Sequence, residues 1–177
     1  MLSTILIVVC VVVVLVLGVI ALRPPVFHLE RSMVTKAPPE RVFALINDFR
    51  LWPAWSPWEN IDPAMKKTFA GPATGTGAVY SWDGNKKVGA GRMTIANTEP
   101  PGRIDIKLDF FRPFPANNTT TFTMVHDQFG TTKVTWAMDG RNNFAAKAFQ
   151  LVMSMDAVVG KDFAKGLAAL KAAAERG

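Results

Sequence analysis

The sequence predicts an α+β fold, in which an antiparallel sheet of about seven strands packs on one long C-terminal helix, preceded by a single N-terminal transmembrane helix. Residues 2–22 form an apolar run without a charge. Residues 65–140 alternate between apolar and polar side chains, which is typical of antiparallel strands with one solvated face. Residues 143–176 repeat apolar side chains at intervals of three and four, which indicates a helix with one buried stripe.

The apolar run predicts that residues 1–22 are a transmembrane anchor, because about 20 apolar residues span a bilayer as a helix. A cleaved signal peptide is the alternative. Such peptides begin with positive charge and have a shorter apolar core, whereas only the α-amino group is charged here. Val19 and Ala21 fit a cleavage signal, so the alternative stays open, although a retained anchor is favoured. Cys10, the only cysteine, lies within the run, so one chain cannot form a disulfide.

The basic side chains are scattered along the chain and give a formal net charge of +6. Nucleic-acid binding requires basic residues gathered on one face of a recognisable module, so we expect no nucleic-acid partner. Positive charge favours contact with anionic lipid, although ordinary solubility explains it equally well. Arg23, Arg31 and Lys36 follow the anchor and no basic residue precedes it. The positive-inside bias therefore places the soluble domain on the cytoplasmic face of the membrane, as a single-pass protein.

A linker of residues 23–25 joins the anchor to the soluble domain, residues 26–177. The linker contains two prolines, which end the helix. Residues 26–36 are expected to form a strand. The segment APPERVFALINDF predicts a helix, because prolines and Glu40 stand at its start and apolar side chains follow at helical spacing. The segment LWPAWSPWEN, at residues 51–60, is expected to be a broken helix or a loop.

Alternation with a period of two predicts which side chains of the later strands share one apolar face. These are Ala78, Tyr80, Trp82, Ile104, Ile106, Leu108, Phe110, Phe122, Met124, His126, Val134, Trp136 and Met138. Asn142 or Asn143 is expected to cap the final helix. Its buried stripe is expected to consist of Ala148, Val152, Met155, Val159, Phe163, Leu167 and Leu170.

Four segments together resemble the helix-grip fold of the SRPBCC superfamily, which includes START-type, Bet v 1-like and polyketide cyclase/dehydrase domains. They are APPERVFALINDFRLWPAWSPWE, GTGAVYSWDGNKKVGAGRM, GTTKVTWAMDG and GKDFAKGLAALK, and the resemblance covers residues 28–174. It implies a curved seven-stranded sheet wrapped around the C-terminal helix, with a ligand cavity between them. The superfamily includes lipid carriers, hormone receptors, cyclases and co-chaperones, so the resemblance indicates a fold rather than a function.

The resemblance makes the bulky side chains of the sheet and of the tryptophan-rich segment candidates for lining this cavity. They are Trp52, Trp55, Trp58, Tyr80, Trp82, Arg92, Phe110, Phe122, Met124, His126, Trp136, Met138 and Met155. Core filling is the alternative for each of them, and membrane contact is a further one for the tryptophans. Strand parity favours a surface position for Arg92, but an inward Arg92 would hold a carboxylate or phosphate. His126 is a candidate base or donor, or a neutral histidine bonded to a neighbour.

No nucleophile motif is visible, and two histidines with one cysteine do not make a zinc or haem site, so we expect no metal and no cofactor. Acid–base catalysis needs several polar groups converging in the cavity. The available groups are Glu59, Tyr80, Asp83, Arg92 and His126. Convergence of two of them on one point would favour an enzyme.

These observations favour a membrane-anchored domain that binds a hydrophobic small molecule, lipid-like or polyketide-like, between the sheet and the C-terminal helix. One alternative is an enzyme of the polyketide cyclase/dehydrase type. The other is a co-chaperone-like interaction module without a ligand, which a solidly filled interior would favour.

Overall fold

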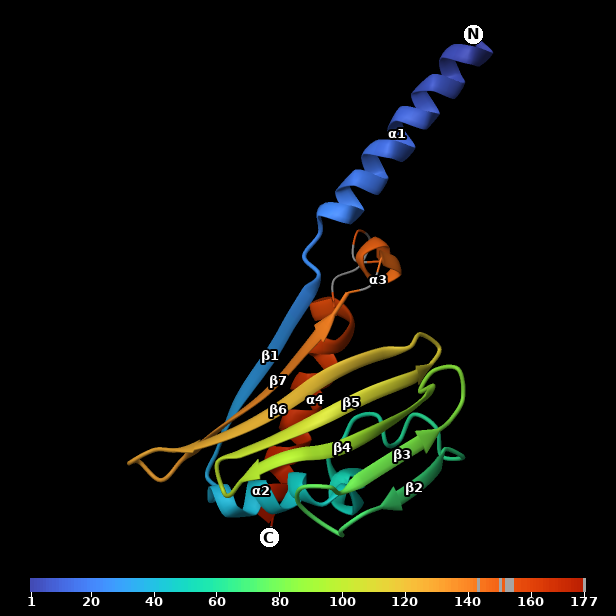
Figure 1. Ribbon diagram of the computed structural model, residues 1–177. Helices are drawn as coiled ribbons and strands as arrows, with labels where there is room; N and C mark the ends of the chain where they lie inside the picture. Colours follow the sequence, from blue (N-terminus) through green and yellow to red (C-terminus); the bar gives the residue numbers. More distant parts are fainter. Residues whose placement is uncertain (143, 150, 152–154, 177) are drawn as a thin grey trace.

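The computed structural model describes residues 1–142, 144–149, 151 and 155–176 (Figure 1). Its elements in chain order are α1 (Leu2–Leu22), β1 (Val26–Thr35), α2 (Pro39–Asn47), the 3₁₀ helix η1 (Phe49–Ala54), β2 (Lys66–Ala70), β3 (Val79–Asp83), β4 (Ala90–Glu99), β5 (Arg103–Arg112), β6 (Ala116–His126), β7 (Thr132–Arg141), α3 (Phe144–Phe149) and α4 (Met155–Arg176).

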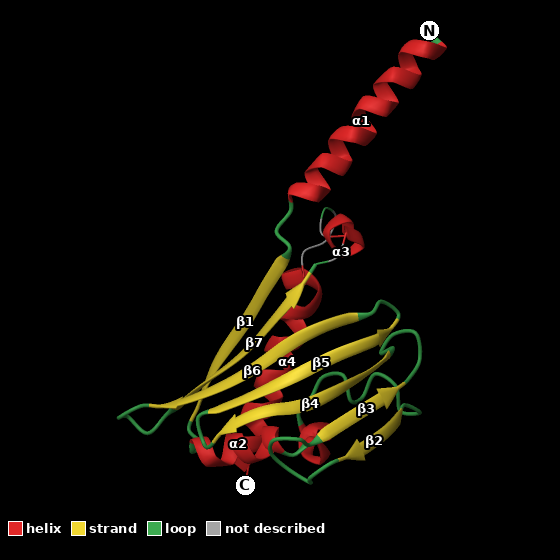
Figure 2. Cartoon of the chain, in the orientation of Figure 1, coloured by secondary structure: helices red, strands yellow, loops and turns green. Residues whose placement is uncertain are grey.

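The seven strands form one antiparallel sheet in the order β1-β7-β6-β5-β4-β3-β2. The helices α2 and α4 cover one face of it (Figure 2). The first strand pairs with the last along ten residues, from Val26 opposite Arg141 to Thr35 opposite Thr132. The predicted helix-grip α+β fold is therefore confirmed. The β1–β7 pair also brings the start of the domain beside the end of its sheet.

The side chains that alternation assigned to the apolar face are buried or partly buried, except for His126 at the end of β6. In β5, Ile104 and Ile106 are fully buried beneath the helices, whereas Lys107 between the strand's apolar residues is exposed. Residues Phe163, Leu167 and Leu170 of α4 meet this apolar face and are buried. A helix with one apolar stripe needs such a face, because about 25 cal/mol is gained per Å² of apolar surface removed from water.

The predicted C-terminal helix over residues 143–176 was wrong in its first part. Residues 144–149 form the separate short helix α3, and α4 begins at Met155. Spacing of three and four cannot reveal such a break, because both helices have the same period. The helix α3 lies beside the end of α1, where Lys147 Nζ donates a hydrogen bond to the carbonyl oxygen of Ala21 at 3.2 Å (Figure 1). Asn143 and Val152, two of the predicted cap and stripe residues, lie outside the described residues.

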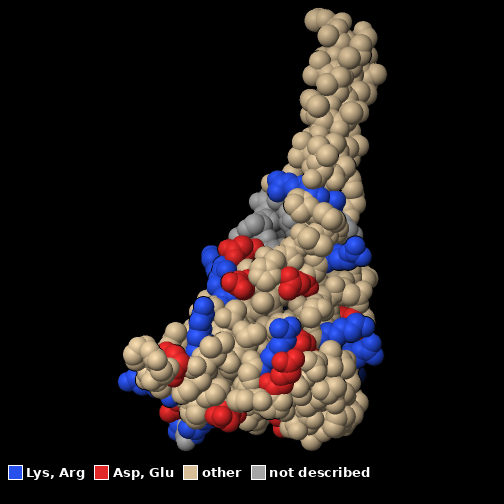
Figure 3. Space-filling view, turned by 60° about the vertical axis from the view of Figure 1, so that its left-hand side comes forward, with Lys and Arg blue, Asp and Glu red and all other residues tan. Residues whose placement is uncertain are grey.

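The helix α1 extends away from the domain, and nearly all its side chains are exposed. In the space-filling view this rod carries no charged side chain, whereas Lys, Arg, Asp and Glu are spread over the domain (Figure 3). By length and composition α1 is able to cross a membrane, a property that signal sequences near an N-terminus share.

Glycines of α4 lie where other side chains approach the helix closely. A Cβ at Gly166 would lie 2.8 Å from Cζ3 of Trp136 and 3.0 Å from Cδ of Pro57, which are parts of rigid rings. A Cβ at Gly160 would lie 2.5 Å from Nη2 of Arg31, the far end of a flexible side chain. The two sites therefore differ in what an added methyl group would displace.

We expect different effects from Gly166→Ala and Gly160→Ala. Alanine in a helix interior is favoured over glycine by roughly 0.5–1 kcal/mol. At Gly160 the Arg31 side chain has to leave its exposed ion pair with Asp156, which costs roughly 0–1 kcal/mol, so we expect little net change. At Gly166 overpacking against the Trp136 and Pro57 rings costs roughly 1–3 kcal/mol, so the net effect is a loss of stability. Chemical unfolding of the full chain in lipid nanodiscs measures both, and a gain in stability at Gly166 would contradict the proposed contact.

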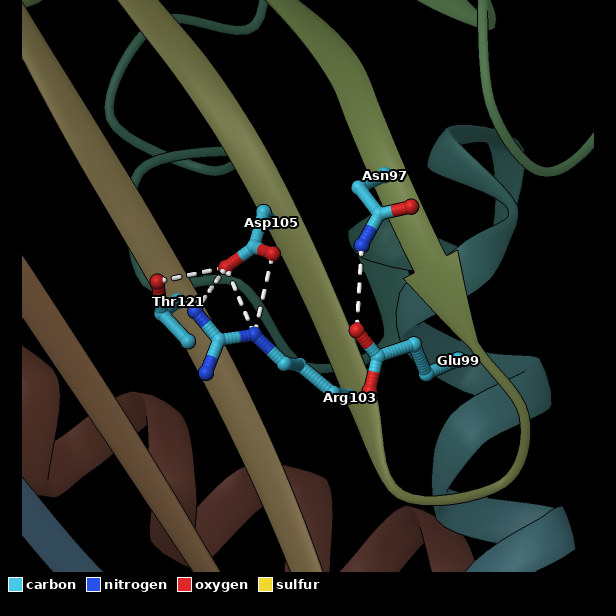
Figure 4. Close-up of polar contacts among 5 residues, drawn as sticks. All are labelled: Asn97, Glu99, Arg103, Asp105 and Thr121. Atoms are coloured by element: carbon cyan, nitrogen blue, oxygen red, sulfur yellow. Dashed lines mark hydrogen bonds and ion pairs between the residues drawn. The ribbon is translucent and has the colours of Figure 1, made fainter.

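The outer face of the sheet carries an ion pair at Asp105 of β5 (Figure 4). Arg103 donates hydrogen bonds to both carboxylate oxygens, with Nε 2.9 Å from Oδ2 and Nη2 2.9 Å from Oδ1, and Thr121 Oγ1 donates to Oδ1 at 2.8 Å. The bonds from Arg103, partly offset by burial, lower the pKa of Asp105. Nearby on β4, Asn97 Nδ2 donates to Glu99 Oε1 at 3.3 Å.

We expect Asp105→Asn to lower the free energy of unfolding near neutral pH by about 0.5–1 kcal/mol, a modest amount because Arg103 is half exposed. The carboxyl group has a lower pKa in the folded chain than in the unfolded chain. Its contribution is therefore fully present above the unfolded pKa of about 4 and is lost as the pH falls through the folded value. Unfolding measured as a function of pH should show the difference between wild type and variant shrinking below about pH 4. A constant difference would contradict this assignment.

Candidate functional site

A cavity of about 240 Å³ lies between the sheet, α4 and the segment that follows η1. This volume exceeds the roughly 150 Å³ in which an apolar protein cavity holds benzene, and falls just below the usual range of ligand pockets, about 300–1,000 Å³. Its lining is mostly apolar and aromatic. The lining residues are Trp52, Ser56, Trp58, Glu59, Met65, Tyr80, Trp82, Lys87, Val88, Met93, Leu108, Phe110, Asn118, Thr120, Trp136, Met138, Val159 and Phe163.

Two tryptophans of the proline-rich segment are fixed by the end of α2. Trp52 Nε1 donates a hydrogen bond to the carbonyl oxygen of Ile46 at 2.9 Å, and Trp55 Nε1 donates to that of Leu45 at 3.1 Å. The last four carbonyl groups of a helix have no hydrogen-bond donor within the helix. The indole N–H groups of Trp52 and Trp55 therefore provide donors for two of these carbonyl groups in α2. Pro53 lies inside η1, which keeps this segment from continuing as an α-helix.

Trp136 of β7 is the centre of an aromatic cluster in the cavity wall. Its ring stacks on Phe163 of α4 at a centroid distance of 4.1 Å and on Phe122 of β6 at 4.8 Å. Trp55 and Trp58 meet it edge to face, at 5.6 and 5.5 Å. The cluster joins the helix, the sheet and the tryptophan-rich segment, so the three walls of the cavity are held by one set of contacts.

A polar cluster of Glu59, Tyr80 and Lys67 lies toward the edge strand β2 and its neighbour β3. The Tyr80 hydroxyl donates a hydrogen bond to Glu59 Oε1 at 2.7 Å, and Lys67 Nζ donates to Glu59 Oε2. Both Glu59 and Tyr80 are buried and line the cavity, whereas Lys67 is partly exposed. Burial, together with the hydrogen bond and negative charge of Glu59, raises the pKa of Tyr80. The phenol therefore stays protonated and able to donate.

The structure brings seven of the thirteen candidate residues into the cavity wall: Trp52, Trp58, Tyr80, Trp82, Phe110, Trp136 and Met138. Trp55, Phe122 and Met124 are buried in the surrounding core and are not part of the wall. Met155 begins α4, and its side chain lies outside the described part of the structure. Whether any of these residues contacts a ligand stays a prediction.

The burial expected for His126 on the apolar face was wrong, and Arg92 lies on the surface, as its parity favoured. The guanidinium of Arg92 lies on the outer face of the sheet, 3.5 Å from Asp109 Oδ2 and 5.9 Å from the centre of the Phe111 ring. His126 is exposed at the end of β6, with Nδ1 3.1 Å from Thr132 Oγ1. His126 ends β6 next to the β6–β7 hairpin, which projects beyond the helices (Figure 1), so its parity alone does not bury it.

Asp83 is also exposed and pairs with Arg112. Of the five groups considered for catalysis, only Glu59 and Tyr80 therefore meet inside the cavity.

Several wall residues were missed because they come from irregular segments. Ser56 and Met65 belong to the segment between η1 and β2, and Lys87 and Val88 to the β3–β4 connection, where no periodicity predicts direction. Asn118 and Thr120 have the parity of Phe122 in β6, so alternation alone was able to identify them. Among the described residues, no group of three His, Cys, Asp or Glu is placed to hold a metal ion.

Residues 26–175 match the family model described as polyketide cyclase/dehydrase and lipid transport. The chain belongs to this family. No curated protein matches the chain significantly.

Solved structures share the fold of this family member. The two-domain aromatase/cyclase BexL from the BE-7585A biosynthetic pathway aligns with a TM-score of 0.65 and 16% identity, over 90% of this chain and 53% of that one. A Thermobifida fusca protein aligns with a TM-score of 0.61 and 23% identity, over 84% of this chain and 93% of that one. The Aha1 dimer from Colwellia psychrerythraea aligns with a TM-score of 0.60 and 16% identity, over 85% of this chain and 98% of that one. At such identities these likenesses show the fold alone.

Tyr80 is the only tyrosine of the chain, so ultraviolet absorbance of phenolate reports on it without interference. We expect no ionisation in the folded protein near the usual pKa of about 10. Since the unfolded chain loses this proton and the folded chain keeps it, stability should fall as the pH rises above about 10. Glu59→Gln should lower the pKa of Tyr80 but leave it above the usual value, because burial remains.

The matched control is Glu99→Gln on the exposed outer face, which should leave the Tyr80 titration unchanged. Ionisation of Tyr80 near its usual pKa in the folded wild type would contradict the buried pair.

Proposed function

We propose that this protein is a membrane-anchored binding domain for a hydrophobic small molecule, which occupies the cavity between the sheet and α4. The observation that carries the proposal is the apolar, aromatic cavity of about 240 Å³ in a chain of this family. Ligand pockets are typically concave and apolar with a few placed polar groups, and here Glu59 and Tyr80 are such groups.

In this proposal the bilayer around the anchor is the source of the ligand. Burial of an apolar molecule gains about 25 cal/mol per Å² relative to water, but almost nothing relative to lipid. A ligand taken from a bilayer must therefore be selected by shape and by polar contacts rather than by hydrophobicity. Only residues 23–25 separate α1 from β1, so a bilayer around α1 would lie close to the domain.

Retention of α1 in the membrane and the cytoplasmic position of the domain are parts of this proposal. The intact mass of the protein recovered from a membrane fraction distinguishes a retained anchor from a cleaved signal sequence, because cleavage removes most of residues 1–22. Protease protection of vesicles containing the chain tests the side on which the domain lies.

A second candidate function is catalysis of the cyclase/dehydrase type, which the contact between Glu59 and Tyr80 favours. Two of the groups required for acid–base chemistry meet within hydrogen-bonding distance in the cavity. However, Lys67 and Tyr80 already occupy both carboxylate oxygens of Glu59. Either function requires a ligand in this cavity, so binding is the conclusion. The third alternative, a co-chaperone-like interaction module, requires a filled interior, and the cavity of about 240 Å³ does not favour it.

Binding is tested by equilibrium dialysis of the full chain in phosphatidylcholine nanodiscs against empty nanodiscs, with the aromatic ketone 2-acetylnaphthalene as the probe. We expect saturable binding of one probe per chain. Val159→Trp places an indole in the cavity wall and should weaken binding by about tenfold or more, which corresponds to ~1.4 kcal/mol.

The matched control is Ala164→Trp, which adds the same ring on the exposed side of the same helix and should bind like wild type. Absence of excess probe, or equal binding by both variants, would contradict binding in this cavity.

A further inference from the structure

Lys87 brings a positive charge to the cavity wall. It lies in the connection between β3 and β4 and is the only Lys or Arg among the described residues that line the cavity. It is exposed, and within the described part of the chain its ammonium group has no ion pair or hydrogen bond. The stem of a lysine commonly lies along an apolar surface while the ammonium group stays in water. Lys87 therefore marks the mouth, where the cavity opens to solvent, and puts an unpaired cation there.

The connection that carries Lys87 is fixed against the cavity wall. Asn85 Oδ1 accepts hydrogen bonds from the backbone N–H groups of Lys87 at 2.8 Å and of Val88 at 3.4 Å. The backbone N–H of Asn85 donates to Asp62 Oδ2 at 2.7 Å. Trp82, another wall residue, donates from Nε1 to the carbonyl oxygen of Val88 at 3.1 Å. The backbone of Lys87 is thus already held at the mouth, and only its side chain has to be ordered when a ligand binds.

The carboxylates in and beside the cavity wall have partners of their own. Glu59 pairs with Lys67, and Asp83 pairs with Arg112. Asp62 accepts hydrogen bonds from two backbone N–H groups, at 2.7 and 3.1 Å. The ammonium group at the mouth is therefore available to an anion that the described part of the chain does not supply.

The mouth lies at the end of the sheet that is joined to α1. Val26, the first residue of β1, pairs with Arg141 at the end of β7. Ala90, the first residue of β4, pairs with Arg112 at the end of β5. Because neighbouring strands are antiparallel throughout the order β1-β7-β6-β5-β4, both β1 and β4 begin at this end, and so does the connection that carries Lys87 (Figure 1). A molecule that leaves a bilayer around α1 would meet this end of the domain first.

We propose that the ligand is an apolar acid, whose apolar body fills the cavity and whose carboxylate or phosphate pairs with Lys87 at the mouth. The inference rests on the proposed function, since it needs a ligand in the cavity. The volume of about 240 Å³ limits the apolar body to about one or two rings. An anionic group deeper in the cavity would be repelled by the buried carboxylate of Glu59, so the acid lies at the mouth.

Attraction of the β3–β4 connection to an anionic bilayer surface is a different explanation of its exposed lysines. Lys86 is also exposed and, within the described part of the chain, also has no partner, but it is not part of the cavity wall. If a bilayer surface is the partner, Lys86 and Lys87 contribute alike. If an acid in the cavity is the partner, Lys87 matters far more than Lys86.

The experiment compares two probes of nearly the same shape, 2-naphthoate, which is an anion near neutral pH, and 2-acetylnaphthalene, which is neutral. Binding of each to the full chain in phosphatidylcholine nanodiscs, which carry no net charge, is measured by dialysis against empty nanodiscs. We expect Lys87→Gln to weaken the binding of 2-naphthoate by about three- to fivefold, the effect of losing one exposed ion pair. The binding of 2-acetylnaphthalene should not change. Lys87→Glu, which reverses the charge, should weaken the binding of 2-naphthoate further.

Lys86→Gln is the matched control. It removes the same charge from the neighbouring residue, outside the cavity wall, and should leave the binding of both probes close to that of wild type. A second readout needs no variant. Because salt screens exposed charges, raising the salt concentration should weaken the binding of 2-naphthoate to wild type relative to that of 2-acetylnaphthalene.

The outcomes separate this inference from the proposed function. If 2-acetylnaphthalene binds, but 2-naphthoate does not bind or binds Lys87→Gln as tightly as wild type, the acid inference is overturned and binding in the cavity stands. Equal losses in Lys86→Gln and Lys87→Gln also overturn it, because they indicate a general attraction to the surface of the connection. If neither probe binds, the proposed function fails and this inference fails with it.

Discussion

The stack of Phe163 on Trp136 decides how α4 lies on the sheet, and the cavity depends on it. Toward the C-terminus of α4, Leu167 and Leu170 pack among fully buried side chains such as Ile106 and Val134, so that part of the interior is solid. Toward its N-terminus, Val159 and Phe163 face the cavity instead. Gly166 allows the Trp136 ring to come close to the helix at the boundary between these two parts.

The regular parts of this structure were predictable, because each has a period that the chain repeats. Ile104, Ile106 and Lys107 are enough to orient β5, and the stripe of Phe163, Leu167 and Leu170 orients α4. The break between α3 and α4 was not predictable, since two helices with one period look like a single helix. His126 shows the limit of alternation, because parity gives direction but does not tell where the opposing layer ends.

The candidate site was predictable only in part, because its polar half combines segments without periodicity. Glu59 belongs to an irregular stretch, Tyr80 to β3 and Lys67 to β2, and only the folded sheet brings them together. The tryptophan-rich segment had several open interpretations. The structure divides them residue by residue: Trp52 and Trp55 complete the end of α2, whereas Trp58 and Trp52 contribute to the cavity wall. A single role for all three does not describe them.

The pairing of β1 with β7 has a mechanical consequence. The strand β1 continues from α1 after three residues and is bonded to β7 over its whole length (Figure 1). A pulling force on α1 along this strand would load the ten-residue β1–β7 pairing in shear. Its hydrogen bonds would then share the force rather than break one after another. A force on α1 would therefore be passed to β7, the strand that contributes Trp136 and Met138 to the cavity wall.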